Sequence, residues 1–485
     1  MTLTRRGFLA ASAAMAATTA WPRLAAAGEQ PLSLTATTRV IEVDGRAATV
    51  MGLANGSGGQ GLILDPGQRF RVDLTNALAE DTIIHWHGQI PPNAQDGVPG
   101  LPMPLLKPGE TRSFDYAPLP GTFWMHSHVP LQEMSLLAAP LIVRRPEDLV
   151  ADRQEAVMFL HDFSFRAPAE VMAELVEGGG HHDMAAMGAP AAGHGAMAGM
   201  DHSGMAMGGT GHSGMGGMAM DLNDIEFDAY LANDRTLADP EVIAVERGGR
   251  VLLRVINAAA ATSFWIDTGG IAARLVAVDG HPVAPVKGTH FGLAMGQRLD
   301  LEIDIPDAGA FPILALREGA RERTGIVLAT PGASVPRIEA MGDSASGAFD
   351  IDLAQEGLLR AALAVAETSL AARPADRSHM IMLGGSMQPY LWTIDGRTWG
   401  DHRPITARTG ERVHLTFHNM SMMGHPMHLH GHVFQVVNVN GQAISGALRD
   451  TVYVPPMAMV TVALDAGEAA RWMLHCHHMP HLFTG

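Results

Sequence analysis

The chain has 485 residues, of which 50 are acidic and 33 basic, and its formal net charge is −17 at pH 7. This negative balance argues against nucleic acids and anionic membrane surfaces as partners. A single cysteine excludes an internal disulfide framework, and beyond the first residues no run is long and apolar enough to span a bilayer. The length predicts about three domains.

The N-terminus has the features of an export signal. Thr4-Arg5-Arg6-Gly7-Phe8-Leu9 precedes an alanine-rich apolar run to about Ala20, and Ala25-Ala26-Ala27 forms a small-residue cleavage site. This pattern is typical of a twin-arginine signal peptide. We therefore expect residues 1–27 to be removed and the mature protein to be soluble and periplasmic.

A ten-residue pattern occurs three times along the chain. Gly-x-Arg, alternating apolar residues and a closing Asn recur at 67–76, 248–257 and 410–419. Alternation with period two predicts half-buried strands, and repetition at domain spacing predicts three β-domains. We place these domains at residues 28–147, 148–335 and 336–485.

Histidine pairs mark the first and third of these domains. The first contains His85-Trp86-His87-Gly88 and His126-Ser127-His128, and the third contains His425-Pro426-Met427-His428-Leu429-His430 and His475-Cys476-His477. A strand presents both histidines of a His-x-His pair on one face. It turns Cys476 to the opposite face, so one segment can serve two metal sites, and Cys plus two His is the blue-copper ligand set.

The middle domain lacks such pairs. Gly121–His126 and Arg471–His475 are predicted strands that lead into histidine motifs, whereas the comparable strand at 309–316 contains no histidine. We predict that the middle domain holds no metal and acts as a spacer and scaffold. Ligands from the outer domains must then meet at an interface between domains.

Residues 181–220 form a methionine–histidine segment. They include nine methionines, five histidines and eleven glycines. Such a composition cannot bury enough apolar surface to order itself, so it predicts a mobile insert. A neutral linker is one interpretation, but exposed methionine oxidises easily, and its thioether prefers Cu(I). We favour copper capture.

The four histidine motifs, in this order, resemble those of the multicopper oxidases across nearly all of the mature chain. The resemblance implies three consecutive cupredoxin-like Greek-key β-sandwich or barrel domains, an all-β fold. It also implies four copper ions, one of type 1, one of type 2 and two of type 3. The implied ligands are His425, Cys476 and His481 for type 1; His85 and His428 for type 2; and His87, His126 and His477, with His128, His430 and His475, for the type 3 pair.

Asp96 and two departures complete the comparison with the family pattern. Asp96 matches an acidic residue that supports the trinuclear cluster and its proton supply, a catalytic role; a simple turn aspartate before Gly97 is the alternative. The family's axial type 1 position would fall one residue past Gly485: either the chain continues there, which we favour, or the copper lacks that ligand. Pro480 stands where some copper-oxidising relatives have glutamate.

The implied activity is oxidation of a substrate by O2. The favoured substrate is Cu(I), oxidised to Cu(II) in copper tolerance, because the export signal and residues 181–220 both fit that role. Laccase-type oxidation of phenols is the second hypothesis. A non-catalytic periplasmic copper store is the third, although storage does not need a ten-histidine set.

Overall fold

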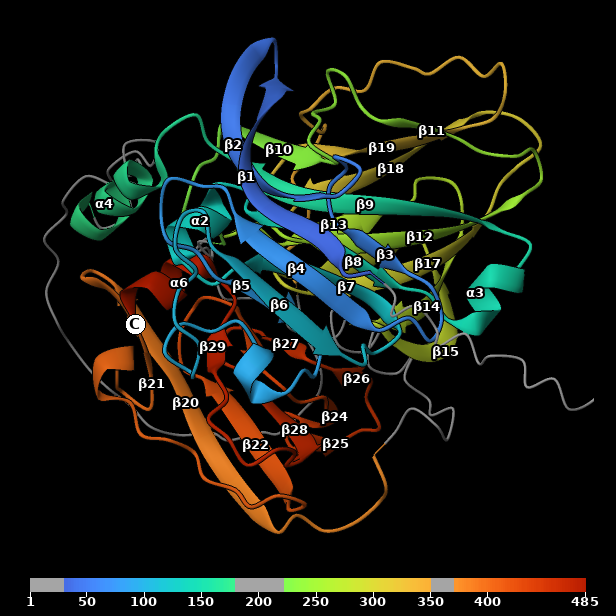
Figure 1. Ribbon diagram of the computed structural model, residues 1–485. Coiled ribbons are helices and arrows are strands. Elements are labelled where there is room, and N and C mark those ends of the chain that lie inside the picture. Colours follow the sequence, from blue (N-terminus) through green and yellow to red (C-terminus); the bar gives the residue numbers. More distant parts are fainter. Residues whose placement is uncertain (1–29, 179–221, 350–369) are drawn as a thin grey trace, which may run out of the picture.

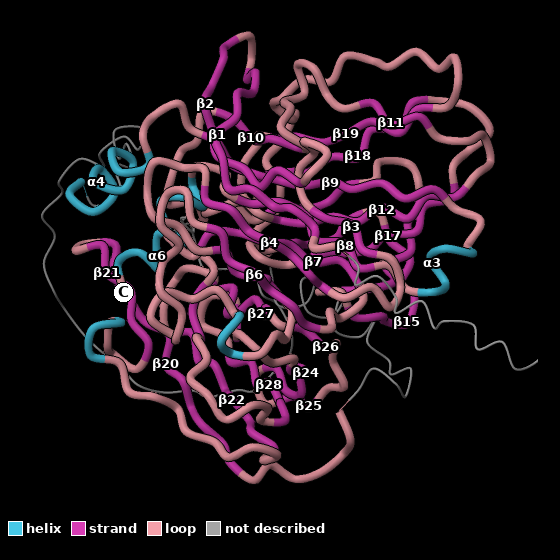
Figure 2. The backbone as a smooth tube through the Cα atoms, in the orientation of Figure 1, coloured by secondary structure: helices cyan, strands magenta, loops and turns pink. Residues whose placement is uncertain are grey.

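The computed structural model describes residues 30–178, 222–349 and 370–485. The predicted export signal and the methionine–histidine segment therefore lie outside the described residues. Strands dominate and helices are short (Figure 2). Among the described residues, no helix has the length and apolarity needed to cross a membrane.

The first domain is a sandwich of two four-stranded sheets. Its sheet orders are β2-β1-β4-β6 and β3-β8-β7-β5. Apolar residues of the two sheets, such as Val72 and Phe114 from one and Phe123 and Leu141 from the other, interdigitate in one core. The strands are β1 (Leu32–Val43), β2 (Arg46–Asn55), β3 (Leu62–Leu64), β4 (Phe70–Asn76), β5 (Ile84–His87), β6 (Thr111–Tyr116), β7 (Gly121–Ser127) and β8 (Ala138–Val143).

The middle domain repeats this design with a six-stranded and a five-stranded sheet. The orders are β10-β9-β12-β17-β14-β15 and β11-β19-β18-β13-β16. The strands are β9 (Gln154–Phe163), β10 (Ala229–Ala232), β11 (Val242–Ala244), β12 (Arg250–Asn257), β13 (Phe264–Asp267), β14 (Ala273–Val278), β15 (His281–Gly288), β16 (His290–Leu293), β17 (Arg298–Asp304), β18 (Ala310–Arg317) and β19 (Arg323–Ala329).

The third domain packs the sheet β21-β20-β22-β28-β24-β25, with β26 beside β24, against the three-stranded sheet β27-β23-β29. Its strands are β20 (Arg377–Met387), β21 (Tyr390–Ile394), β22 (Arg412–Asn419), β23 (His425–Leu429), β24 (Phe434–Val439), β25 (Gln442–Ala443), β26 (Leu448–Arg449), β27 (Thr451–Val454), β28 (Met459–Asp465) and β29 (Leu474–Cys476).

Short helices connect these sheets. They are η1 (Asn93–Gln95), α2 (Pro130–Met134), α3 (Pro146–Val150), α4 (Pro168–Gly178), η5 (Trp399–Asp401) and α6 (Met479–Thr484). The helix α4 lies at the edge of the molecule, and α2 and α6 lie side by side (Figure 1).

The predicted repeat corresponds to the same strand in each domain, namely β4, β12 and β22. The closing asparagine of the repeat is buried in all three domains, and its side-chain amide hydrogen-bonds to backbone carbonyls of two different loops. The amide of Asn76 donates to Glu80 O and Leu106 O, and that of Asn257 donates to Thr262 O and Leu293 O. Asn419 donates to Met423 O and Pro455 O. Buried side-chain amides need such hydrogen-bond partners. The same asparagine contact therefore connects the loops at the end of the equivalent strand in each domain.

Candidate metal centre

Cys476 and two histidines form a compact site in the third domain. The antiparallel register places Cys476 of β29 opposite Met427 of β23, and α6 brings His481 back to the same place. The sulfur lies 3.6 Å from Nδ1 of His425 and 3.6 Å from Nδ1 of His481. One nitrogen of each ring therefore faces the thiol.

The other nitrogen of each ring has a partner on the side away from the sulfur. His425 Nε2 lies 2.9 Å from Ser421 Oγ, and His481 Nε2 lies 3.3 Å from Asp224 Oδ2. The indole of Trp392 stacks on His481 with 3.9 Å between ring centroids. These contacts fix both rings with Nδ1 directed at Cys476.

Burial controls the protonation of this site. It raises the pKa of Cys476 to about 12 and lowers the pKa of His425 to about 4. At neutral pH the metal-free site therefore has a protonated thiol and a neutral imidazole. A metal that binds the thiolate must displace that proton.

Eight further histidines meet between the first and third domains. The β5–β7 register pairs His85 with His126, and the β23–β29 register pairs His428 with His475. All eight side chains are at most 7% exposed: His85, His87, His126, His128, His428, His430, His475 and His477.

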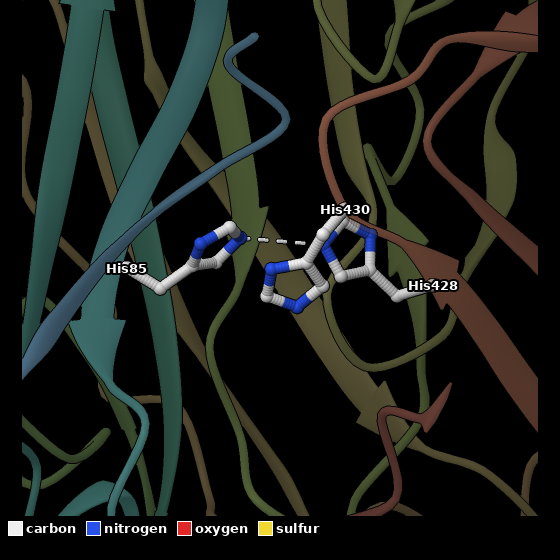
Figure 3. A group of neighbouring side chains, drawn as sticks. All are labelled: His85, His428 and His430. Carbon is white, nitrogen blue, oxygen red and sulfur yellow. Dashed lines mark hydrogen bonds between the residues drawn. The ribbon is translucent and has the colours of Figure 1, made fainter. Parts of the chain in front are cut away.

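His85 and His428 point their Nε2 atoms at each other. The two atoms are 3.4 Å apart (Figure 3). The opposite nitrogen of each ring donates to a backbone carbonyl, His85 Nδ1 to Asp96 O at 2.8 Å and His428 Nδ1 to Asp450 O at 2.9 Å. With those tautomers, two lone pairs face each other, which is favourable only around a cation.

His128, His430 and His475 form a second converging group. His430 Nε2 lies 3.3 Å from His128 Nε2 and 3.1 Å from His475 Nε2. Nδ1 of His475 donates to Cys476 O at 2.9 Å, and Nδ1 of His430 donates to a carboxylate oxygen of Asp96 at 2.9 Å. The potential metal-binding atoms of this trio lie within 4.8 Å of one another.

His87, His126 and His477 form a third group. Their rings are neighbours, with centroids 4.9 to 5.6 Å apart. Within the described residues, His87 Nδ1, His126 Nε2 and both nitrogens of His477 have no hydrogen-bond partner. Unpartnered buried nitrogens are costly, so this donor set fits metal ions.

Burial lowers the pKa of most of these histidines well below the usual value, and neighbouring imidazoles add to the effect for His128, His430 and His477. The rings with lowered pKa values, His87, His128, His428, His430, His475 and His477, are therefore neutral at pH 7, which is the form that binds metals. All eleven predicted ligands are thus brought into two clusters, linked by the segment His475-Cys476-His477. The eight-histidine cluster forms one continuous group, and its trios share members.

Asp96 lies against this cluster and is only 1% exposed. It follows η1, and its carboxylate accepts the proton of His430 Nδ1 while its carbonyl accepts that of His85. Oδ1 has no hydrogen-bond partner among the described residues. The geometry therefore supports the role in orienting ligands over the simple turn interpretation.

Sequence reasoning missed Asp450, which precedes β27. Its Oδ1 lies 3.0 Å from His87 Nε2, and its carboxylate also accepts from the guanidinium of Arg298. Burial alone would raise the pKa of the Asp450 carboxyl. The charge of Arg298 and hydrogen bonds from Arg298, His428 and His87 outweigh burial and hold this pKa well below its usual range. A lone Asp before Thr451 offered no motif that could have revealed this contact.

Glu133 of α2 was missed as well. Its two carboxylate oxygens lie 3.5 Å from Nδ1 of His126 and 3.7 Å from Nδ1 of His477. Three acidic side chains, Asp96, Glu133 and Asp450, thus surround the eight-histidine cluster. Asp96 and Asp450 hydrogen-bond to its rings and orient them from outside, while Glu133 places a carboxylate beside two rings.

The middle domain does more than the predicted spacer role. Its Arg298 binds Asp450, donates to Thr122 O of the first domain at 3.2 Å, and so joins all three domains. Its Asp224 contacts His481 and accepts a hydrogen bond from Tyr390. The described residues of this domain therefore supply outer contacts to both clusters.

Fold and site together define a class: a three-sandwich metalloprotein with a Cys-His₂ site joined by adjacent residues to a polynuclear histidine cluster. The sequence models of multicopper oxidase domains match residues 35–148, 202–330 and 372–485. The chain belongs to the multicopper oxidase family, and it is a copper-dependent oxidoreductase.

Two curated proteins illustrate the range of its relatives. The chain is 29% identical to multicopper oxidase MmcO of Mycobacterium tuberculosis over 422 residues, which cover 86% of this chain and 78% of that protein. It is 25% identical to copper resistance protein A of Escherichia coli, with 86% and 85% covered.

Solved structures share its fold. Fet3p, described as a multicopper oxidase that functions in iron import, superposes with a TM-score of 0.72 at 16% identity, covering 93% of this chain and 88% of that one. The laccase of Botrytis aclada gives 0.66 at 20% identity, covering 93% and 85%. These similarities confirm the predicted fold of three cupredoxin-like domains.

Proposed function

We propose that this protein is a periplasmic cuprous oxidase that holds four copper ions and protects against copper by oxidising Cu(I) with O2. The balanced reaction is four Cu(I), one O2 and four protons giving four Cu(II) and two waters. When bound, copper supplies the one-electron steps and the dioxygen chemistry, which no side chain of this chain can supply. The observation that carries the proposal is the continuity of His475-Cys476-His477 between the two clusters.

The chain's own residues prepare this chemistry. Cys476 and its chain neighbours His475 and His477 give a covalent route of one residue from the Cys-His₂ site to the eight-histidine cluster. Contacts with Asp96 and Asp450 hold His430 and His87 in one tautomer and orientation, and the carboxylate of Glu133 lies 3.5 Å from Nδ1 of His126. Such contacts commonly change metal affinity or activity by about 10- to 100-fold.

Cu(I) is the favoured substrate for two reasons. The relatives include proteins named for copper resistance, and residues 181–220 are rich in thioether and imidazole groups, the soft and intermediate ligands of copper. The twin-arginine pattern at residues 4–9 supports a location in the periplasm, where the enzyme would encounter toxic Cu(I).

Oxygen uptake by the copper-loaded protein tests this proposal. We expect rapid uptake with Cu(I), four Cu(I) consumed per O2, and slower uptake with a phenol. Removal of residues 181–220 is expected to lower the rate at low Cu(I) concentration. A protein that consumes O2 only with the phenol would contradict the proposal.

Oxidation of phenols is the second candidate because laccases of Botryotinia fuckeliana are also among the relatives, at 23% and 24% identity. In that case the phenol is the faster substrate, and removal of residues 181–220 leaves its rate unchanged or higher. The same oxygen-uptake experiment therefore separates the two functions.

A further inference from the structure

The outer face of the third domain's large sheet carries a row of copper-type donors. Met382 of β20 pairs with His418 of β22, and His418 pairs with Met459 of β28. All three are partly exposed, while their neighbours along each strand are buried. Directly paired residues place their side chains on the same face, with Cβ atoms about 4.5–5.5 Å apart. The result is a Met–His–Met row on the solvent side.

A second pair of methionines continues this face. The backbone N–H of Asn419 donates to Ala458 O at 2.9 Å, which continues the β22–β28 pairing to these two residues. Met420 is the next residue after Asn419, and Met457, with a φ of +58°, lies in the turn directly before Ala458. Their exposed fractions are 57% and 64%, and nearby Met422 is 55% exposed. We call Met382, His418, Met459, Met420 and Met457 the thioether face.

Packing does not account for these residues. Core methionines fill irregular gaps, but none of the five lies in the buried core of this domain. Within the described residues, the imidazole of His418 makes no hydrogen bond or ion pair. Exposed methionine is prone to oxidation, so a strip of it around a free histidine favours ligand binding over packing.

The thioether face adjoins the Cys-His₂ site. Ser421 follows Met420 directly, and its hydroxyl lies 2.9 Å from Nε2 of His425. His418 lies two residues before Met420, which corresponds to about 7 Å along an extended strand at about 3.4 Å per residue. A cation on this face would therefore lie on the His425 side of the electron-accepting site.

We propose that the thioether face is a Cu(I)-binding site, with Met382, His418 and Met459 as its principal ligands. Thioether and imidazole are the ligands that select Cu(I) over harder cations. The bound ion loses one electron to the Cys-His₂ site, and O2 is the final oxidant. Cu(II), a harder ion, then binds the thioethers weakly and leaves. This inference rests on the proposed Cu(I) oxidation and identifies where that substrate docks.

The test is the steady-state kinetics of the copper-loaded holoenzyme with Cu(I). We expect the double variant Met382→Leu/Met459→Leu to raise KM for Cu(I) by about tenfold, because leucine keeps the volume and removes the sulfur. His418→Gln should raise KM similarly. Ag(I), which has the same ligand preference but donates no electron, should compete with Cu(I) in the wild type and less in the variants.

Met380→Leu is the matched control. Met380 lies on the same face and is 55% exposed, but it pairs with Thr416, whose hydroxyl contacts Thr461, and not with a histidine. This control should keep the wild-type KM, and an intact blue absorption reports correct folding in every variant. An unchanged KM for Cu(I) in the double variant would refute Cu(I) binding at the thioether face. An equal rise of KM for a phenol in that variant would refute it as well. A wild type that does not oxidise Cu(I) would instead refute the proposed function.

Discussion

Single side chains in this protein act mainly by choosing which nitrogen of a neighbouring histidine is free. Asp96 accepts the proton of His430 Nδ1, and backbone carbonyls accept those of His85 and His428, which leaves each Nε2 free. At His87 the other ring nitrogen meets the outer partners, because the side-chain oxygens of Asp450 and Thr451 both lie 3.0 Å from Nε2. His87 therefore presents Nδ1 to the cluster.

The substitution Asp450→Asn tests this tautomer choice. Arg298 donates to both carboxylate oxygens of Asp450, and Oδ1 also contacts Nε2 of His87, so an amide nitrogen at either position faces a donor. Where the amide nitrogen takes the Oδ1 position, Nε2 of His87 becomes an acceptor and its proton moves to Nδ1, and in the other orientation the grip of Arg298 on the side chain weakens. We expect loss of copper from the histidine cluster and a roughly 10- to 100-fold fall in O2 reduction, while the blue absorption stays. Wild-type copper content, measured by mass spectrometry of the metal, would contradict this.

Cys476 is the residue on which the smaller cluster depends. In Cys476→Ser the hydroxyl is a poor copper ligand, so we expect loss of the blue absorption and of oxidase turnover. The circular dichroism of the β-sheets should remain, since Cys476 contributes only a small side chain to the core. Wild-type turnover in this variant would disprove the Cys-His₂ assignment.

At the scale of elements, short segments between strands position the polar groups. The η1 turn delivers Asp96 and then reverses direction at Gly97, whose φ is +86°. A Cβ at this position would lie 1.9 Å from Ile84 O, at the start of the strand that carries His85 and His87. The turn and the ligand strand are therefore in direct contact, and only glycine allows it.

The substitution Gly97→Ala should consequently disturb both the η1 turn with Asp96 and the ligand strand β5. We expect a loss of stability of about 2–4 kcal/mol, from backbone strain and a forced shift of β5. Weaker copper retention should accompany it, because Asp96 and His85 move. Thermal unfolding and dialysis against a chelator measure the two effects. Gly100→Ala is the control, since it has a similar φ of +71° but no atom within 4 Å of the added Cβ.

At the scale of the molecule, buried charge joins the three domains. Arg298 of the middle domain reaches Asp450 of the third and Thr122 of the first, and Asp279 and Arg449 extend the network. Removing one partner of such a buried group leaves an uncompensated charge, which typically costs about 3–5 kcal/mol. The middle domain thus holds the first and third domains in register.

The many buried histidines also make the metal-free protein sensitive to acid. Their folded pKa values lie below the unfolded value, so the unfolded chain takes up protons first as pH falls. Stability is therefore retained above about pH 6.5 and lost between there and pH 4, by about 1.4 kcal/mol per pH unit for each excess proton. Denaturant unfolding of the metal-free protein between about pH 7.5 and 5 measures this slope, and a pH-independent midpoint would contradict it. Bound copper should move the loss to lower pH.

Local patterns predicted the three sandwiches and the four His-x-His pairs, because alternation and His-x-His spacing act within one strand, and the resemblance to the multicopper oxidases completed the set of eleven predicted ligands with His425, Cys476 and His481. Only the tertiary structure decided the roles of Asp450, Asp224, Glu133 and Arg298, since these residues act across domain contacts. The pairing of Met382, His418 and Met459 likewise depends on strand register. Register is a relation between segments distant in sequence, set by which faces become buried on folding, so no local pattern could reveal it.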